Sequence, residues 1–247
     1  MVAATFWTGS SARAPWGWVW RGRDRESGTV YAIKLLRPDL LGDPVLVGRF
    51  VRERTALMAI RHPKTVAVHD MVVEGDRLAL IMDFVSGEDL RAYRLRRGGS
   101  LPPAEAAWLV AQICEALAAT HAAGIVHRDL KPANVLLDGT RPNAPVRLAD
   151  FGIARILDEA SVTSAETILG TPSYLSPEVV KGEQPGPACD VYAVGITLYE
   201  LIAGSVPFQG SPAAVFQQHL SSPPRPDPRI PRELWAIITR CLAKTPA

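Results

Sequence analysis

The residues best suited to chemistry in this chain lie in two short stretches of its second half. Residues 127–134 read His-Arg-Asp-Leu-Lys-Pro-Ala-Asn, and Asp-Phe-Gly follows at 150–152. Together they supply two carboxylates, a lysine and an amide. Transfer of a phosphoryl group needs such a set, because a carboxylate must orient the accepting hydroxyl, a cation must neutralise the moving group, and oxygen atoms must hold Mg²⁺. Asn134 and Asp150 can provide the hard oxygen ligands that Mg²⁺ prefers.

A second pair of charged residues lies in the first quarter of the chain, on elements that otherwise look apolar. Lys34 belongs to a predicted strand at residues 29–36, and Glu53 lies on the apolar face of a helix predicted for residues 45–60. A charged group that faces a core needs a partner. We therefore expect Lys34 and Glu53 to form an ion pair, and the alternative is a solvated lysine.

The remaining pattern predicts mainly strands in the first third of the chain and mainly helices in the rest, and the change from one to the other lies near residues 83–86. Such an order favours two lobes. The predicted strands are at residues 17–20, 29–36, 65–73, 77–84, 135–137 and 146–148. The predicted helices after the first are at residues 101–123, 190–203, 213–220 and 233–244.

Composition excludes several classes of protein. The chain has 247 residues, of which 47% are hydrophobic, and a net charge of +2, so it can bury a substantial core but has no long basic run typical of nucleic-acid binding. Cys114, Cys189 and Cys241 are widely spaced, which argues against a zinc site or disulfide framework and favours a reduced, cytoplasmic setting. No apolar run reaches the roughly eighteen residues of a membrane span, and no signal peptide is evident.

Taken together, these motifs resemble those of protein kinases, and more closely the eukaryotic-like serine/threonine kinases of bacteria. A third motif, Gly-Thr-Pro-Ser-Tyr-Leu-Ser-Pro-Glu at residues 170–178, resembles the end of a kinase activation segment, with Ser-Pro-Glu in place of the commoner Ala-Pro-Glu. The resemblance runs from Gly17 to Ala247. It implies an α+β, two-lobed fold with a β-rich N-lobe at residues 1–85, containing one main helix, and a mainly helical C-lobe at residues 86–247.

The resemblance also implies roles for the charged residues. Asp129 would orient the substrate hydroxyl and accept its proton, and Lys131 would neutralise charge on the transferring group. Lys34, supported by Glu53, would hold the α- and β-phosphates. The metal would be held by Asn134 and Asp150, while His127 and Phe151 would pack the two motifs together.

The nucleotide site is assigned in the same way. The resemblance places Val19, Ala32 and Leu136 against the adenine ring, with Met82 as gatekeeper. Backbone groups of Asp83 and Val85 would bond the base edge. Asp89 would lie near the ribose, and Gly17 belongs to the loop that would cover the phosphates.

The acceptor and the regulation are suggested by residues around the activation segment. Thr171 together with Lys131 favours serine or threonine over tyrosine as acceptor. Arg128 precedes the catalytic aspartate, and kinases with this arginine often order the segment by phosphorylation. Thr163 and Thr167 are therefore candidate autophosphorylation sites, although hydroxyl-rich loops are common. Asp190 resembles the aspartate that braces the catalytic loop, and it could also be a helix N-cap.

Two parts of the chain depart from the family pattern. The glycine-rich loop has alanine at positions 12 and 14 and proline at 15, which restricts the approach of the backbone to phosphates, so we expect weaker ATP binding. Only about eleven residues precede this loop, so we expect a short or irregular first strand. The arginine that usually pairs with the position of Glu178 lies beyond Ala247 in the pattern. We therefore expect Glu178 to lack this partner and the last helix to be missing, whether the chain is a fragment or an unusually short kinase.

The expected function is transfer of phosphate from ATP, with Mg²⁺ or Mn²⁺, to serine and threonine hydroxyls of proteins, including autophosphorylation. The resemblance adds a homodimer through the N-lobe as a candidate assembly, and no nucleic-acid partner is expected. A pseudokinase scaffold is the alternative favoured by the altered loop, and the intact charged residues argue against it. A small-molecule kinase of the aminoglycoside type should lack the 170–178 motif.

Overall fold

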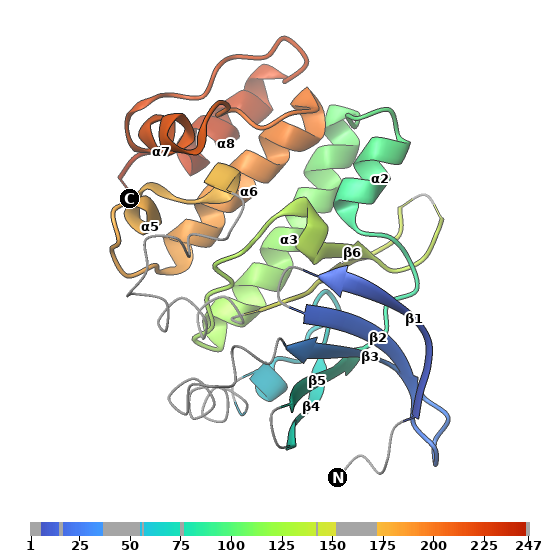
Figure 1. The fold of residues 1–247 in the computed structure, drawn as a ribbon. Coiled ribbons are helices and arrows are strands. Elements are labelled where there is room, and N and C mark those ends of the chain that lie inside the picture. The colour runs from blue at the N-terminus through green and yellow to red at the C-terminus, as the bar shows by residue number, and fades with distance from the viewer. Residues whose placement is uncertain are drawn as a thin grey trace.

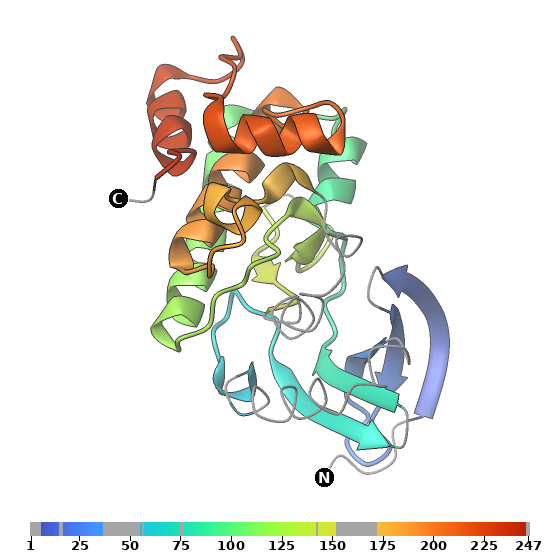
Figure 2. The same cartoon turned by 60° about the vertical axis from the view of Figure 1, so that its left-hand side comes forward.

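A computed structural model describes residues 6–14, 17–36, 55, 57–74, 77–141, 143–151 and 172–245. The chain forms a five-stranded antiparallel sheet from its first third and a mostly helical lobe from the rest (Figure 1). Figure 2 shows the same separation after a 60° turn, with the strands to one side of the helices. The expected two-lobed α+β architecture is confirmed.

The strands of the N-lobe sheet run in the order β1-β2-β3-β5-β4. The strands predicted at residues 17–148 are all present, and β1, the first strand expected ahead of the glycine-rich pattern, precedes them. Pairing of β1 with β2 shifts register between Trp7 and Ser11, so the first strand is irregular, as expected, but not short. The bounds are β1 (Phe6–Ala14), β2 (Gly17–Arg23), β3 (Val30–Leu36), β4 (Val68–Glu74) and β5 (Arg77–Asp83).

Most of the helix predicted for residues 45–60 lies outside the described residues, Glu53 included. Residue 55 and residues 57–59 are helical. Leu57 and Ile60, near its end, are buried with the hydrophobic side chains of β4 and β5. The described end of this helix is therefore anchored on the core side of the sheet, as its apolar face predicts.

The C-lobe is built around a helix that is buried along nearly its whole length. Every residue of α6 (Pro187–Ala203) from Tyr192 onward is buried, and α3 (Pro103–Ala122) and α8 (Arg232–Cys241) pack against it. Gly195 permits the close approach of α8, because a Cβ there would lie 2.6 Å from the Cβ of Cys241. Among the helices that the structure describes, none is long and apolar enough to cross a membrane.

The ends of these helices agree with the sequence signals to within about three residues. Prolines occupy the first turn of α3 and α6, where the missing N–H costs no helical hydrogen bond. The shorter helices of the C-lobe are α5 (Pro177–Val180) and α7 (Pro212–Ser221), and a 3-10 turn, η3, covers Pro172–Tyr174.

Two of the described helices were not predicted, the four-residue α5 and α2 (Leu90–Arg96). Helix α2 begins where the Asp89 side chain accepts a hydrogen bond from Ala92 N–H at 2.8 Å. The chain reaches α2 through Gly87, where a Cβ would lie 1.8 Å from the carbonyl oxygen of Leu137. Only glycine fits there, so the link between the lobes runs directly against the C-lobe.

Between the lobes lies a small two-stranded sheet that carries the active-site loops. Strands β6 (Val135–Leu137) and β7 (Val146–Leu148) pair in antiparallel fashion and lie where short strands were predicted. The turn η2 (Pro132–Asn134) leads directly into β6. Leu148 also bridges to Thr65 of the N-terminal part of the chain, which joins this small sheet to the N-lobe.

Candidate active site

The catalytic loop connects α3 to β6 and brings the predicted residues together. Lys131 Nζ donates to both carboxylate oxygens of Asp129, at 2.8 and 2.7 Å. Asn134 Nδ2 donates to the Asp129 backbone oxygen at 2.7 Å and to its carboxylate at 3.0 Å. The carboxylate that would receive a proton is therefore held in one orientation by two neighbours on its own loop.

A buried carboxylate on helix α6 binds the backbone of this loop. Asp190, 1% exposed on α6, accepts hydrogen bonds at 2.8 Å from both His127 N–H and Arg128 N–H, and His121 donates to it at 2.7 Å. Burial alone raises the pKa of Asp190. These hydrogen bonds and the nearby histidines lower it by more than burial raises it, so the pKa of Asp190 lies below the ordinary value. Asp190 thus remains an acceptor for the loop.

The bracing position expected for Asp190 agrees with this geometry, whereas the N-cap alternative is wrong. Helix α6 begins at Pro187 and its N-cap is Gly186, so Asp190 lies inside the first turn. Arg128, one of its two backbone donors, has a φ of 67°, a left-handed conformation that is uncommon for a side-chain-bearing residue. The two hydrogen bonds to Asp190 offset the cost of this conformation.

His127 links the catalytic loop to the second motif. Its ring is fully buried, donates through Nε2 to the Ala149 backbone oxygen at 2.9 Å, and meets the ring of Phe151 edge-on with centroids 5.2 Å apart. Ala149 N–H in turn donates to the Asn134 backbone oxygen at 2.9 Å. The packing positions expected for His127 and Phe151 agree with these contacts.

Lys34 reaches across the lobes to Asp150. Its Nζ lies 2.7 Å from Asp150 Oδ1, and the lysine side chain is 1% exposed. Burial raises the pKa of Asp150, but the charge and hydrogen bond of Lys34 outweigh it and hold that pKa below the ordinary value. Asp150 has a φ of 64°, so both key carboxylate motifs contain a residue in the left-handed region. The pairing of Lys34 with Glu53 lies outside the described residues and stays a prediction.

One face of the N-lobe sheet carries the residues expected around the nucleotide. Residues directly opposite in an antiparallel pair point to the same face. Val19 lies opposite Lys34, and Ala32 lies opposite Met82, so the four side chains share the face whose lysine meets Asp150. Gly17 lies opposite Leu36 in the same register.

The remaining residues expected around the nucleotide lie at the junction of the lobes. Asp83 ends β5, Val85 follows it and packs against the hydrophobic core, and Leu136 lies in β6. Asp89 caps α2 and bridges to Leu136. The expected ribose contact of Asp89 stays a prediction, since its carboxylate is engaged at the helix N-terminus.

The oxygen donors present fit a metal bound together with phosphates. Asn134 uses its amide nitrogen on Asp129, which leaves Oδ1 as the atom able to ligate a metal, and Asp150 has one oxygen beyond that bonded to Lys34. Within the described ranges no cluster of three His, Cys, Asp or Glu side chains could hold a metal. A site with one carboxylate and one amide suits Mg²⁺, which usually keeps waters and phosphate ligands.

Several predicted residues lie outside the described part of the chain, namely Glu53, Thr163, Thr167, Thr171 and Pro15. Glu178 is described: it is 9% exposed, and its Oε1 has no hydrogen-bond partner among the described residues. The lack of its usual arginine stays a prediction. Ala12 and Ala14 lie in β1 opposite Val19 and Gly17, where the glycine-rich pattern was aligned.

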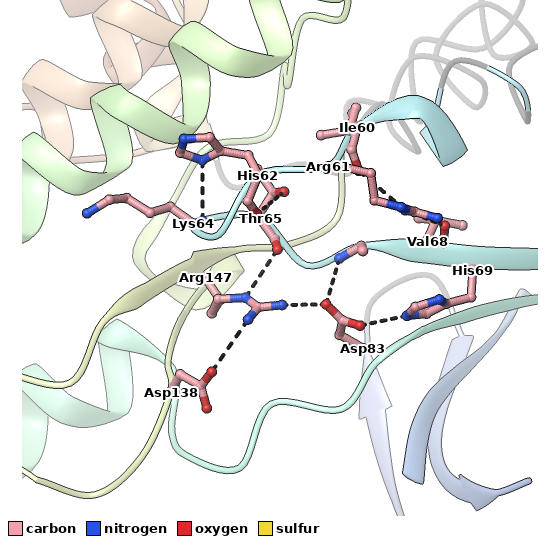
Figure 3. A network of polar contacts seen from close by, with 11 residues as sticks. Ile60, Arg61, His62, Lys64, Thr65, Val68, His69, Asp83, Asp138 and Arg147 are labelled. Atoms are coloured by element: carbon pink, nitrogen blue, oxygen red, sulfur yellow. Dashed lines mark hydrogen bonds and ion pairs between the residues drawn. The ribbon is translucent and has the colours of Figure 1, made fainter. Parts of the chain in front are cut away.

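Two polar networks were missed by the sequence analysis. Glu200 of α6 accepts from Tyr174 Oη at 2.5 Å and from Arg94 Nη2 at 3.0 Å, which ties η3 to α2. Asp83 forms an ion pair with Arg147 of β7 (Figure 3). A charge inside a short apolar strand, the signal that singled out Lys34, was also available for Arg147.

The family model for the protein kinase domain matches residues 15–247. The chain is 51% identical to the serine/threonine-protein kinase PkaB of Streptomyces coelicolor, over 94% of this chain and 56% of the relative. It is 48% identical to PkaA of the same organism, over 95% and 45%, and 37% identical to PknA of Mycobacterium tuberculosis, over 94% and 54%. The chain spans about half the length of these curated relatives.

The match covers the braced catalytic loop, the Lys34–Asp150 pair and the two-lobed fold alike. The chain therefore belongs to the protein kinase family, in the branch of eukaryotic-like serine/threonine kinases of bacteria.

Proposed function

We propose that this chain transfers the γ-phosphoryl group of ATP to serine and threonine hydroxyls of proteins. The observation that carries the proposal is the convergence of two charged sets from different lobes. Asp129, Lys131 and Asn134 lie on one loop, and Lys34 meets Asp150 beside it, with His127 packed between the motifs. Similarity to kinases named for serine and threonine supports the choice of acceptor.

Each residue has a task that its position allows. Asp129 orients the acceptor hydroxyl and takes its proton as the oxygen bonds to phosphorus, and the bond to the ADP oxygen breaks. Lys131, which holds Asp129 here, can turn its charge toward the transferred group. Lys34 binds the phosphates, and Asn134 and Asp150 hold the metal. ATP supplies the phosphoryl group, and Mg²⁺, or Mn²⁺ as the alternative, supplies charge neutralisation.

Further parts of the proposal concern regulation and setting. Autophosphorylation at Thr163 or Thr167, and contact of Thr171 with the catalytic residues, follow from the family pattern. A reduced cytoplasmic setting is supported by free thiols at Cys114, Cys189 and Cys241. The boundary of the lobes near residue 85 is supported by the end of β5 at Asp83. Homodimerisation through the N-lobe stays a prediction.

One transfer assay tests the function. The wild-type chain is incubated with labelled ATP, Mg²⁺ or Mn²⁺ and a generic protein substrate, beside Asp129→Asn. We expect the variant to transfer phosphate about 10²- to 10⁴-fold more slowly, because it loses the proton acceptor, while it binds ADP as the wild type does. Peptide mass spectrometry should find phosphate on serine or threonine, with Thr163 and Thr167 as the first candidates.

The matched control is Asp227→Asn, since Asp227 lies in the loop before α8 and pairs with Arg229. It should transfer phosphate at the wild-type rate. Equal, background-level labelling by the wild type and Asp129→Asn would contradict the proposal and favour a binding scaffold.

A further inference from the structure

Asp83, the last residue of β5, collects an unusual number of contacts. Its backbone N–H donates to the Ala67 oxygen at 3.0 Å, and its carboxylate accepts from Ala67 N–H at 3.2 Å and from His69 Nε2 at 2.6 Å. The same carboxylate pairs with Arg147 Nη2 (Figure 3). Three of these contacts lie within the N-lobe, and the fourth comes from the other lobe.

Arg147 uses its guanidinium at three points. Its Nε donates to the Thr65 backbone oxygen at 3.1 Å, its Nη2 pairs with Asp83, and its Nη1 lies 3.5 Å from Asp138 Oδ2 (Figure 3). The side chain is 20% exposed. A planar, permanently charged fork suits such a bridge, because its donors are fixed relative to one another.

The segment that contains Thr65 comes from the N-lobe but bonds to the C-lobe. Val66 N–H donates to the Leu148 oxygen and Leu148 N–H donates to the Lys64 oxygen, each at 2.8 Å. Lys64 Nζ reaches Gln112 at 3.1 Å and Glu115 at 3.2 Å, both on α3. Arg147 therefore ties Asp83 to a part of the chain that is itself fixed on the C-lobe.

The strand pairing places Arg147 beside a residue proposed to contact adenine. Leu136 lies directly opposite Arg147 in β6–β7, so both point to one face, and both are half-buried while their strand neighbours are buried. The proposed ring contact, Leu136, and the proposed base-edge groups at Asp83 and Val85 thus belong to different lobes, with Arg147 between them.

We propose that Arg147 is a positioning residue for the nucleotide: by pairing with Asp83 it fixes the base-edge segment relative to Leu136 before ATP binds. This inference rests on the proposed function. Fixing a site in advance removes part of the entropic cost of ordering it on binding. Loss of the pair should therefore weaken nucleotide binding, whereas the catalytic loop, held by Asp190, keeps its geometry.

The test compares Arg147→Met with the wild type by calorimetric titration of ADP with Mg²⁺ and by steady-state kinetics. We expect the Kd for ADP and the KM for ATP to rise about three- to tenfold, with kcat changed less than about twofold. In the nucleotide-free protein, amide hydrogen exchange at residues 83–85 should become faster. Arg240→Met, on the remote helix α8, is the matched control and should change none of these values.

A double-variant cycle shows whether Arg147 acts through Asp83. Asp83→Asn alone should weaken ADP binding, and the double variant should bind no more weakly than the weaker single variant, because one contact is lost in both. Arg147→Lys should recover part of the affinity. If Arg147→Met does not fold, Arg147→Lys and Asp83→Asn test the same contact.

Unchanged ADP affinity and unchanged amide hydrogen exchange in the folded variants would overturn the inference. Tighter ADP binding with a higher kcat would also overturn it, because the Arg147–Asp83 pair would then oppose nucleotide binding. A wild-type chain that binds ADP but transfers no phosphate would refute the proposed function alone, since the binding and exchange measurements still test Arg147. A wild-type chain that binds no nucleotide would refute both.

Discussion

The two sides of the active site are held in place by different means. The catalytic loop is fixed within its own lobe: Asp190 binds its backbone, Asn134 and Lys131 bind Asp129, and His127 packs beneath the second motif. The N-lobe face with Val19, Ala32 and Met82 is fixed by strand pairing. It reaches the C-lobe through the ion pairs Lys34–Asp150 and Asp83–Arg147.

This difference suggests that chemistry and nucleotide affinity are separately adjustable. The groups proposed to move a proton are already oriented by contacts within the C-lobe that no nucleotide supplies. The groups proposed to hold the nucleotide depend on charged contacts between the lobes. Changes at the interface should therefore alter KM for ATP, and changes below the catalytic loop should alter stability and turnover together.

The largest effect is expected from Asp190→Asn. An amide can accept from one of the two loop N–H groups but presents its own NH₂ to the other, so a buried donor loses its partner. We expect the free energy of unfolding to fall by about 2–4 kcal/mol and transfer to slow by at least about tenfold. Chemical denaturation and the transfer assay measure these two quantities.

The control for Asp190→Asn is again Asp227→Asn, whose exposed pair with Arg229 should contribute less than about 1 kcal/mol. Equal losses of stability in the two variants would show that the loop does not depend on its buried brace.

The next effect concerns acid and the buried His219 of α7. Its ring is fully buried, and Nδ1 lies 2.9 Å from Tyr192 Oη. Burial, and then the charge of Lys244, lowers the pKa of His219 from 6.5 to about 4. In the unfolded chain, His219 binds a proton more readily than in the folded protein. The contribution of the buried, neutral His219 to the free energy of unfolding is therefore fully present above pH 6.5 and is lost as the pH falls toward 4.

This linkage predicts a loss of about 2 kcal/mol between pH 7 and pH 5. His219→Gln, which cannot titrate, should flatten the dependence of the unfolding free energy on pH in that window, measured by urea denaturation. Gln217→Ala, at an exposed residue of the same helix that carries no titratable group, serves as control and should leave the dependence unchanged. A wild-type curve that is flat from pH 7 to 5 would refute the assignment and would show that the helical lobe has no acid-sensitive histidine.

The smallest effect is expected in the nucleotide cover. Replacing Ala12 and Ala14 by glycine should lower KM for ATP about two- to fivefold, because the backbone can then approach the phosphates more closely, while each change costs about 0.5–1 kcal/mol of stability. Steady-state kinetics and thermal unfolding separate the two. If KM stays constant while stability falls, the alanines do not weaken ATP binding.

Local patterns predicted local structure well. Strands were predicted around residues 135–137 and 146–148 and lie there, since the flanking motifs confine them. The seven-residue helix α2 was missed because it is too short and too rich in arginine to show a clear apolar period.

The long-range ion pairs were the harder part of the site. Lys34 was expected to need a partner, and Asp150 supplies one in the structure, although only Glu53 had been named. Arg147–Asp83 depends on how β7 lies against β5, which is a consequence of the assembled fold and not of spacing along the chain. The brace at Asp190 was found only because the resemblance pointed to it.

The contact at Gly87 has a mechanical consequence. Among the described residues, the backbone joins the two lobes at the Lys64–Leu148 hydrogen bonds and at the link that lies against Leu137 at Gly87, besides the side-chain ion pairs Lys34–Asp150 and Asp83–Arg147. Two fixed points define one axis, so we expect the two lobes to rotate relative to each other about that axis. Strands β4 and β5 lie next to that axis and β1 and β2 lie farthest from it. We therefore expect the strands of the proposed phosphate cover, β1 and β2, to move furthest, and the proposed adenine end of the site to move least.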